Sequence, residues 1–144
     1  MEETQAPWPA REKLSITAVR AVVTAPEGIP LVVVRVDTSS PGLYGLGCAT
    51  FTQRFHAVAA AVDQHIGPML VGRHPADIED INRLVHLSSY WRNGPVLNNA
   101  LSGVDQALWD IAGKRAGMPV YELLGGRVRA AAPRSTRHWT TPPR

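Results

Sequence analysis

The chain has 144 residues, of which 44% are hydrophobic and 19% charged, and Cys48 is its single cysteine. These proportions are typical of one folded domain with a hydrophobic core, and they exclude a disordered chain. A single cysteine excludes a disulfide framework and a cysteine zinc site, and it favours a reducing compartment. The N-terminal residues carry neither a basic segment nor an apolar run, so we expect no signal peptide and a cytoplasmic location.

The formal net charge of +3 is unevenly distributed along the chain. Residues 1–126 carry ten basic and twelve acidic side chains, so this part is net negative. The remaining residues carry five arginines and no acidic side chain. The basic character therefore belongs to residues 127–144, which we expect to form an irregular tail, and nucleic-acid binding by the rest of the chain is not favoured.

Three β-strands are predicted in the first third of the chain. Residues 1–13 precede them and combine two prolines with mixed charges, which indicates a flexible N-terminal extension. The strands are predicted over residues 14–24, 31–38 and 43–50, and the second is a run of β-branched residues. Short turns rich in glycine, proline and serine separate them, which favours an antiparallel meander.

Two of these strands have further features. The first alternates, and we expect it to be buried on much of both faces. Its alternation would place one set of side chains on the same side: Ile16, Ala18, Arg20, Val22 and Thr24. The third strand contains Gly45 and Gly47, which indicate a bulge or the close approach of another backbone, and their spacing does not fit a phosphate-binding loop.

The pattern becomes helical after residue 54. Apolar residues recur at spacings of three and four in three segments, which begin near Phe55, Ile78 and Leu97. Asp77 can cap the second helix, and Gly117 is expected as the left-handed C-cap of the third. The three apolar stripes are Phe55, Val58, Val62, Ile66 and Met69; Ile78, Ile81, Leu84 and Val85; and Leu97, Leu101, Val104, Leu108 and Ile111.

A further short helix is predicted over residues 120–124, before Gly125 and Gly126. The order is therefore three strands followed by three or four helices. This order predicts an α+β domain, in which a three-stranded antiparallel meander is followed by a helix bundle packed on one side.

Most side chains that could carry chemistry have an ordinary structural interpretation. The five histidines lack a metal-ligand partner three or four residues away: His56, His65, His74, His86 and His138. Asp105 and Asp110 are five residues apart and do not share a helix face, so we interpret them as a loop-bonding and a solvated carboxylate. We interpret Trp109 as a packing residue and Cys48 as a buried, inert thiol.

The segment between the third strand and the first helix is the best candidate for ligand binding. Gln53 and Arg54 lie close to a helix start, where an anionic or polyol ligand is favoured. Thr52 could instead serve as an ordinary helix cap, and this alternative stays open.

Five motifs in this order resemble the N-terminal capping domain of the enolase superfamily, in the mandelate racemase-like branch that contains D-mannonate and D-gluconate dehydratases. The resemblance runs from about Leu14 to Arg129, and the domain is predicted over residues 14–126. The motifs are Gly42-Leu43-Tyr44-Gly45-Leu46-Gly47, Ile78-Glu79-Asp80-Ile81, Tyr90-Trp91-Arg92-Asn93-Gly94-Pro95-Val96, Val104-Asp105-Gln106-Ala107-Leu108-Trp109-Asp110-Ile111-Ala112-Gly113-Lys114 and Met118-Pro119-Val120-Tyr121-Glu122-Leu123-Leu124-Gly125-Gly126.

The resemblance implies a capping role in a sugar-acid dehydratase. In that family, a barrel domain supplies the acid/base residues and the carboxylates that hold Mg²⁺. The metal stabilises an enediolate formed by proton abstraction next to the substrate carboxylate, and loss of a β-hydroxyl completes the dehydration. Mg²⁺ thus belongs to the full-length family, and the resemblance implies no cofactor, catalytic residue or metal ligand in this chain.

Two loops of such a domain close over the substrate, and here they match residues 26–30 and 50–54. The resemblance therefore implies Thr52, Gln53 and Arg54 as substrate-binding residues. Relatives that dehydrate mannonate carry Asn-Gly-Arg in the second loop, of which only Arg54 is matched.

The family continues from Gly-Gly-Arg into the first barrel strand, whereas residues 132–144 do not resemble that strand. After Gly126 there is no acidic residue, so no carboxylate Mg²⁺ site can exist there. We therefore expect a truncated, catalytically inactive fragment. A set of codons for Pro133 to Arg144 reads, in the adjacent frame, as Pro-Val-Tyr-Thr-Pro-Leu-Asp-Asp-Ala-Thr-Glu, which suggests a frameshifted gene product.

The expected partner is a barrel domain or subunit of an enolase-superfamily enzyme. The surface facing it should be apolar, so the chain alone can self-associate. Two alternatives stay open. One is a small binding module whose Arg-rich tail, with His138 and Trp139, contacts a polyanion, and the other is an interaction protein that binds an intact dehydratase subunit.

Overall fold

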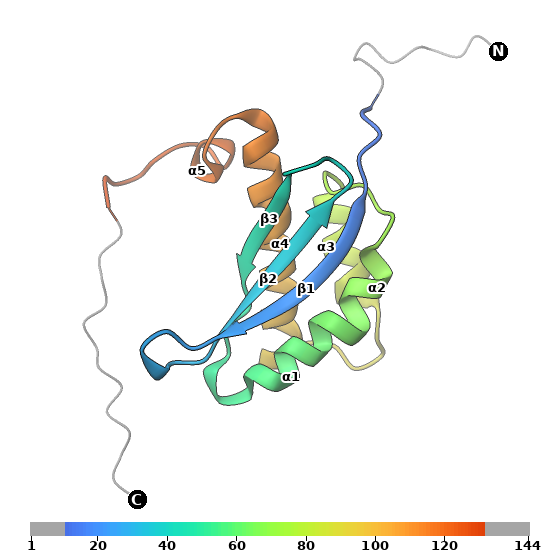
Figure 1. Ribbon diagram of the computed structural model, residues 1–144, viewed down its shortest axis with the longest axis vertical. Helices are drawn as coiled ribbons and strands as arrows, with labels where there is room; N and C mark the ends of the chain where they lie inside the picture. Colours follow the sequence, from blue (N-terminus) through green and yellow to red (C-terminus); the bar gives the residue numbers. More distant parts are fainter. Residues whose placement is uncertain (1–10, 132–144) are drawn as a thin grey trace, which may run out of the picture.

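The computed structural model describes residues 11–131, which form a three-stranded sheet followed by helices (Figure 1). The strands are β1 (Ile16–Thr24), β2 (Leu31–Thr38) and β3 (Tyr44–Cys48). β2 lies in the middle and pairs antiparallel with both neighbours, so the sheet order is β1-β2-β3. This confirms the predicted meander, and the bounds of β2 are those predicted from its β-branched run.

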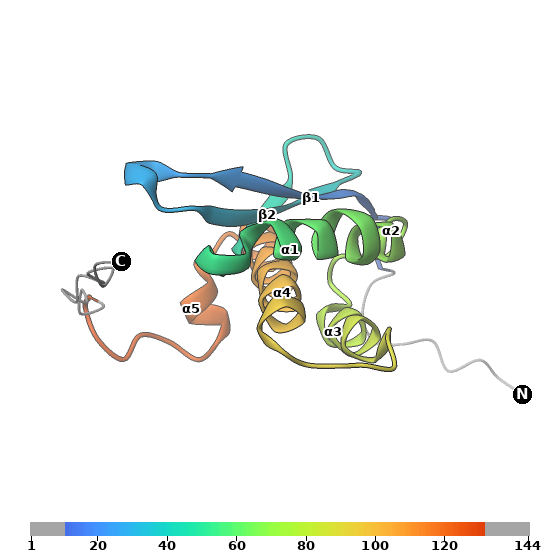
Figure 2. The same ribbon diagram turned by 90° about the horizontal axis from the view of Figure 1, so that it is seen from below.

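The helices lie on one face of the sheet, as Figure 2 shows. The first helical segment consists of α1 (Phe55–Ala60), a π-helical turn (Ala61–Ile66) and α2 (Gly67–Leu70). It is followed by α3 (Ile78–Leu87), α4 (Pro95–Ala116) and α5 (Val120–Leu123). The predicted α+β fold class is therefore confirmed.

The hydrophobic core lies between β2 and the helices. Val32, Val34 and Val36 alternate along β2 and are fully buried. They face the apolar stripes of the helices, whose buried members include Val58, Val62, Val104, Leu108 and Ile111. The stripe predicted on the longest helix begins too early, because Leu97 in its first turn is 41% exposed. As predicted, Gly117 ends this helix in the left-handed conformation, with φ of 65°.

A β-bulge in β1 changes which of its side chains face the helices. Ile16 pairs with Thr38, and Ala18 pairs with Asp37, so β1 has one extra residue opposite β2. The extra residue brings Val19 to the buried face beside Ile16. The alternation predicted from Ile16 onward is therefore wrong beyond the bulge. The predicted burial on both faces is wrong as well, since the last three residues of β1 are exposed.

The start of the described chain is attached to the helices. Arg11 donates hydrogen bonds to both carboxylate oxygens of Asp77, at 2.7 and 3.1 Å, and Arg115 Nη2 donates to Glu12 Oε2 at 2.9 Å. Within the predicted extension 1–13, Arg11 and Glu12 are thus held against the domain. Asp77 occupies the N-cap position of α3 as predicted, but its carboxylate faces Arg11 and forms no capping hydrogen bond to the α3 backbone. The Arg11 hydrogen bonds lower the pKa of Asp77 against the opposing effect of burial.

Residues 1–10 and 132–144 are outside the described residues. The rest of the predicted extension, most of the predicted basic tail and the frameshift hypothesis for residues 133–144 therefore lie outside it too. So do His138 and Trp139, on which the polyanion-binding alternative depends. Within residues 11–131, the helices are too short or too polar to cross a membrane.

Candidate functional site

Thr52, Gln53 and Arg54 form one turn of 3-10 helix, Thr52–Arg54, between β3 and α1. Thr52 is half-buried, whereas Gln53 and Arg54 are exposed. The Arg54 guanidinium turns back over its own loop, where Nη1 donates to the Gln53 carbonyl oxygen at 2.7 Å. Within residues 11–131, no side chain caps this turn or α1, so the alternative interpretation of Thr52 as a helix cap is wrong. The loop thus presents an amide and a guanidinium to solvent.

The other predicted loop, residues 26–30, lies at the same end of the sheet (Figure 1). β1 and β3 are both antiparallel to β2, so the connections that follow them emerge at one end. The loop contains a 3-10 turn, Pro26–Gly28, in which Glu27 and Gly28 have positive φ of 53° and 78°. The fold therefore brings the two loops to one end of the molecule.

The start of the candidate loop is fixed to β2. The Ala49 N–H donates to the Val32 carbonyl at 2.9 Å, and the Val32 N–H donates to Thr50 Oγ1 at 3.1 Å. The Cys48 thiol also donates to Thr50 Oγ1, at 3.2 Å. The prediction that Cys48 is buried is wrong. The alternate residues of β3 face α4, which leaves Cys48 exposed on the other face of the sheet.

The backbones of β3 and α4 come into close contact at glycines. A Cβ atom at Gly45 would overlap the Ala107 carbonyl oxygen, and one at Gly47 would overlap the Gly103 carbonyl oxygen. On the helix side, a Cβ at Gly103 would lie 2.6 Å from Ala49 Cβ. The close backbone approach predicted from the strand glycines is therefore present, and α4 provides the opposing backbone.

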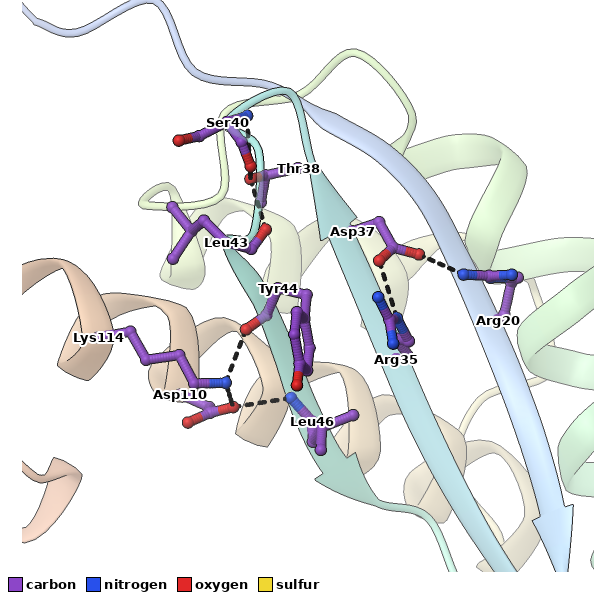
Figure 3. A network of polar contacts seen from close by, with 10 residues as sticks. All are labelled: Arg20, Arg35, Asp37, Thr38, Ser40, Leu43, Tyr44, Leu46, Asp110 and Lys114. Carbon is purple, nitrogen blue, oxygen red and sulfur yellow. Dashed lines mark hydrogen bonds and ion pairs between the residues drawn. The ribbon is translucent and has the colours of Figure 1, made fainter.

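Three polar side chains of α4, spaced four residues apart, bind the outer edge of β3. Asp110 Oδ2 accepts a hydrogen bond from the Leu46 N–H at 2.9 Å. Lys114 Nζ donates to the Tyr44 carbonyl at 2.7 Å and to Asp110 at 2.6 Å (Figure 3). Gln106 binds the backbone of Cys48 at the end of the strand. The interpretation of Asp110 as a solvated carboxylate is therefore wrong.

Sequence reasoning missed this role of Gln106, Asp110 and Lys114. Their spacing of four puts them on one helix face and was a detectable signal. Asp105 does form a hydrogen bond, but its partner is Asn82 of α3, at 3.1 Å, and not a loop. Its carboxylate thus joins two helices.

The open face of the sheet carries a second group of charges (Figure 3). The Asp37 carboxylate accepts from Arg35 Nε at 2.8 Å and from Arg20 Nη2 at 2.6 Å. The Tyr44 ring lies between two cations, with Arg35 Cζ 4.1 Å and Lys114 Nζ 4.5 Å from its centroid. Burial raises the pKa of Asp37, but the hydrogen bonds from Arg35 and Arg20 outweigh it and hold that pKa below its ordinary value. These contacts tie all three strands together.

Residues 11–131 contain no group of three or more His, Cys, Asp or Glu side chains that could hold a metal ion. His56, His65 and His86 are exposed on helices, and His74 bonds to Arg11 and to the Glu12 carbonyl. The described residues therefore do not fit a resident Mg²⁺. Trp109 packs against the core, as predicted.

The comparisons with known proteins agree with this architecture. Residues 8–125 match the family described as "Mandelate racemase / muconate lactonizing enzyme, N-terminal domain". A D-galactonate dehydratase family member from Catenulispora acidiphila is 79% identical over 131 residues, which cover 91% of this chain and 30% of that protein. The family member RspA from Pantoea ananatis is 64% identical over 116 residues, which cover 81% of this chain and 28% of that protein.

A solved structure gives the same result. The crystal structure of an enolase from Pantoea ananatis, with bound D-gluconate and Mg, has a TM-score of 0.79 and 64% sequence identity. The match covers 81% of this chain and 28% of that one. The meander, the helices on one face and this match define the N-terminal α+β domain of an enolase-superfamily protein.

The chain belongs to the mandelate racemase / muconate lactonizing enzyme N-terminal domain family, and its relatives are members of the D-galactonate dehydratase family. It spans about 30% of the length of the curated relatives that it matches.

Proposed function

We propose that residues 14–126 cap the active site of a Mg²⁺-dependent sugar-acid dehydratase of the D-mannonate/D-gluconate type. In this proposal, Thr52, Gln53 and Arg54 contact the sugar acid, and a barrel domain outside these residues holds the metal and the catalytic groups. The observation that carries the proposal is the common position of the two loops, 26–30 and 52–54, at one end of the sheet.

The chemistry of the second loop fits such a substrate. A guanidinium binds a carboxylate through charge-assisted hydrogen bonds, and a side-chain amide both donates to and accepts from hydroxyl groups. Arg54 and Gln53 offer these groups from an exposed turn whose start is fixed to β2. The bound D-gluconate in the Pantoea ananatis structure is a ligand of this kind.

The surface around α5 supports the presence of a barrel partner. Every side chain of α5 is at least partly exposed, and the apolar side chains of Tyr121, Leu124 and Val128 are 46%, 65% and 95% exposed. Between α5, α4 and the start of α3 lies an open groove of about 510 Å³, whose lining includes Trp109 and Leu123 as well as the acidic residues Asp77, Glu79 and Asp80. Exposed apolar side chains beside an open groove are typical of a contact between domains.

In this proposal the 144 residues alone do not dehydrate sugar acids, since residues 11–131 contain no metal-binding group of side chains. The test is a fusion enzyme in which residues 1–126 replace the matching residues of the Catenulispora acidiphila relative. With Mg²⁺, the fusion is expected to dehydrate D-mannonate or D-gluconate, whereas the chain alone is not. Turnover by the purified chain would contradict the proposal.

A substitution in the fusion tests the loop itself. Arg54→Ala removes the guanidinium and is expected to raise KM by about 10- to 100-fold, the effect of losing a charge-assisted hydrogen bond. Arg83→Ala is the matched control, because Arg83 is exposed on α3. Equal KM values for the two variants would show that the Thr52–Arg54 loop does not bind the substrate.

A further inference from the structure

The side chain of Gln106 forms hydrogen bonds to both backbone groups of one residue at the end of β3. Its Oε1 accepts from the Cys48 N–H at 3.1 Å, and its Nε2 donates to the Cys48 carbonyl at 3.4 Å. The amide is itself oriented by a third bond, from Nε2 to Ser102 Oγ at 3.0 Å, one turn earlier in α4. A side-chain amide thus takes the place that a neighbouring strand would occupy.

This contact lies where the chain leaves the sheet toward the Thr52–Arg54 turn. Cys48 is the last residue of β3, and its other side is fixed to β2 through Thr50 and Val32. The strand end is therefore held from two directions, by α4 and by β2. The backbone of Gly47 touches the backbone of α4, which prevents the strand end from moving toward the helix.

The other two α4 side chains that bind β3, Asp110 and Lys114, act farther from the loop. Asp110 and Lys114 bind Leu46 and Tyr44, two and four residues before Cys48. At about 3.3 Å per residue, these contacts lie roughly 7 and 13 Å farther from the loop. Of these three α4 side chains, Gln106 alone binds Cys48, the residue from which the loop departs.

We infer that Gln106 is a positioning residue: it sets the direction in which β3 ends and thereby the place of Thr52, Gln53 and Arg54 over the substrate. The inference rests on the proposed function for the role of the loop. The contacts from which the position of the loop is inferred, between Gln106, Cys48, Thr50 and Val32, all lie within this chain.

The first test is amide hydrogen exchange on the chain as it is. Gln106→Leu removes both hydrogen bonds at nearly constant size. It is expected to speed the exchange of the Cys48 amide and of residues 50–54 by about 5- to 30-fold, the factor for one or two lost hydrogen bonds. The matched control is Asp110→Leu, which should speed exchange at Leu46 and not at residues 50–54. Exchange is compared with Val34 in β2, so that a general loss of stability is recognised.

The second test measures KM and kcat of the fusion enzyme. A purely structural role of Gln106 would not change KM alone. Gln106→Leu is expected to raise KM by roughly five- to tenfold with kcat changed less than twofold, because a displaced loop weakens binding throughout the reaction. Gln106→Glu keeps the acceptor for the Cys48 N–H and should restore part of the KM. Asp110→Leu should leave KM unchanged.

The outcomes separate the inference from the proposed function. Equal exchange of residues 50–54 in Gln106→Leu and Asp110→Leu would overturn the inference. So would a normal KM for Gln106→Leu in a fusion in which Arg54→Ala raises KM. If Arg54→Ala has no effect, the proposed function is wrong, and the exchange experiment still decides whether Gln106 positions the loop.

Discussion

Gly47 is the residue at which β3 comes close to the backbone of α4. A Cβ atom there would overlap the Gly103 carbonyl oxygen and would lie 2.9 Å from the Ala107 nitrogen. Both are backbone atoms of a regular helix and cannot move aside. Gly47→Ala is therefore expected to lower the free energy of unfolding by at least about 3 kcal/mol, measured by urea denaturation. The neighbouring control Cys48→Ala, on the open face, should cost less than about 1 kcal/mol.

Asp37 gives a pH-dependent prediction at the same scale. Its pKa is lowered in the folded state, so its contribution is complete above its unfolded pKa of about 3.9 and is lost as the pH falls through the lower folded value. Asp37→Asn is therefore expected to cost about 1 kcal/mol at pH 7, and the difference from the wild type should shrink as the pH falls below the unfolded value and disappear below the lowered folded pKa. Unfolding curves at several pH values measure this difference in the free energy of unfolding.

The control for this prediction is Asp80→Asn. The ion pair of Asp80 with Arg73, at 3.2 Å, is formed by two exposed side chains and should contribute little. An Asp37→Asn effect of the same size at pH 7 and pH 2 would show that the charge of Asp37 does not stabilise the sheet.

At the scale of elements, helix side chains form hydrogen bonds to backbone groups on both edges of the sheet. The β3 edge is bound by Gln106, Asp110 and Lys114, and on the β1 edge the Ala21 N–H donates to Asp63 Oδ1 at 2.7 Å. Edge strands with free backbone groups pair with other chains, and these side chains occupy part of those groups. Asp63 lies in the π-helical turn Ala61–Ile66, which contacts β1 together with α1 and α2.

Asp63→Ala is expected to lower the free energy of unfolding by about 1–2 kcal/mol, since it leaves the half-buried Ala21 N–H without its acceptor. Asp63→Asn keeps a neutral acceptor and should cost less. Denaturation curves and the exchange rate of the Ala21 amide measure both effects. If the two variants are equally stable, the carboxylate oxygen does not contribute through this bond.

Local patterns predicted the elements well, because element type depends on the residue's neighbours in the sequence. The β-branched run of β2 and the left-handed Gly117 are of this kind. The bulge in β1 was not predictable, since it exists only relative to the register with β2. In the candidate site, the place of the loop was predictable from the strand–helix boundary. The spacing of Gln106 with Asp110 and Lys114 indicated a shared helix face, but it could not show that the partner of Gln106 is Cys48, which lies 58 residues earlier in the chain.

At the scale of the whole molecule, α4 connects the parts of the domain. Its small residues contact β3, its apolar stripe covers β2, and it also contacts α3 and α5. The loop end of the sheet and the exposed surface at α5 are therefore joined through one helix. A partner bound at α5 would be held at a fixed position relative to the Thr52–Arg54 loop, which is the arrangement that a cap over an active site requires.

A charge placed in the exposed surface around α5 should have different effects on the chain alone and on the fusion enzyme. In the chain alone, Tyr121, Leu124 and Val128 leave apolar area in water, so we expect reversible self-association that increases with concentration. Leu124→Glu places a charge in this surface and should shift the chain toward monomer, as measured by sedimentation velocity. In the fusion enzyme the same substitution would bury that charge against the barrel, so it should lower the thermal midpoint.

Val22→Glu, on the exposed face of the sheet, is the control and should change neither property. Loss of self-association with Val22→Glu instead of Leu124→Glu would place the contact on the sheet face, and an unchanged thermal midpoint of the Leu124→Glu fusion would mean that the barrel does not cover α5.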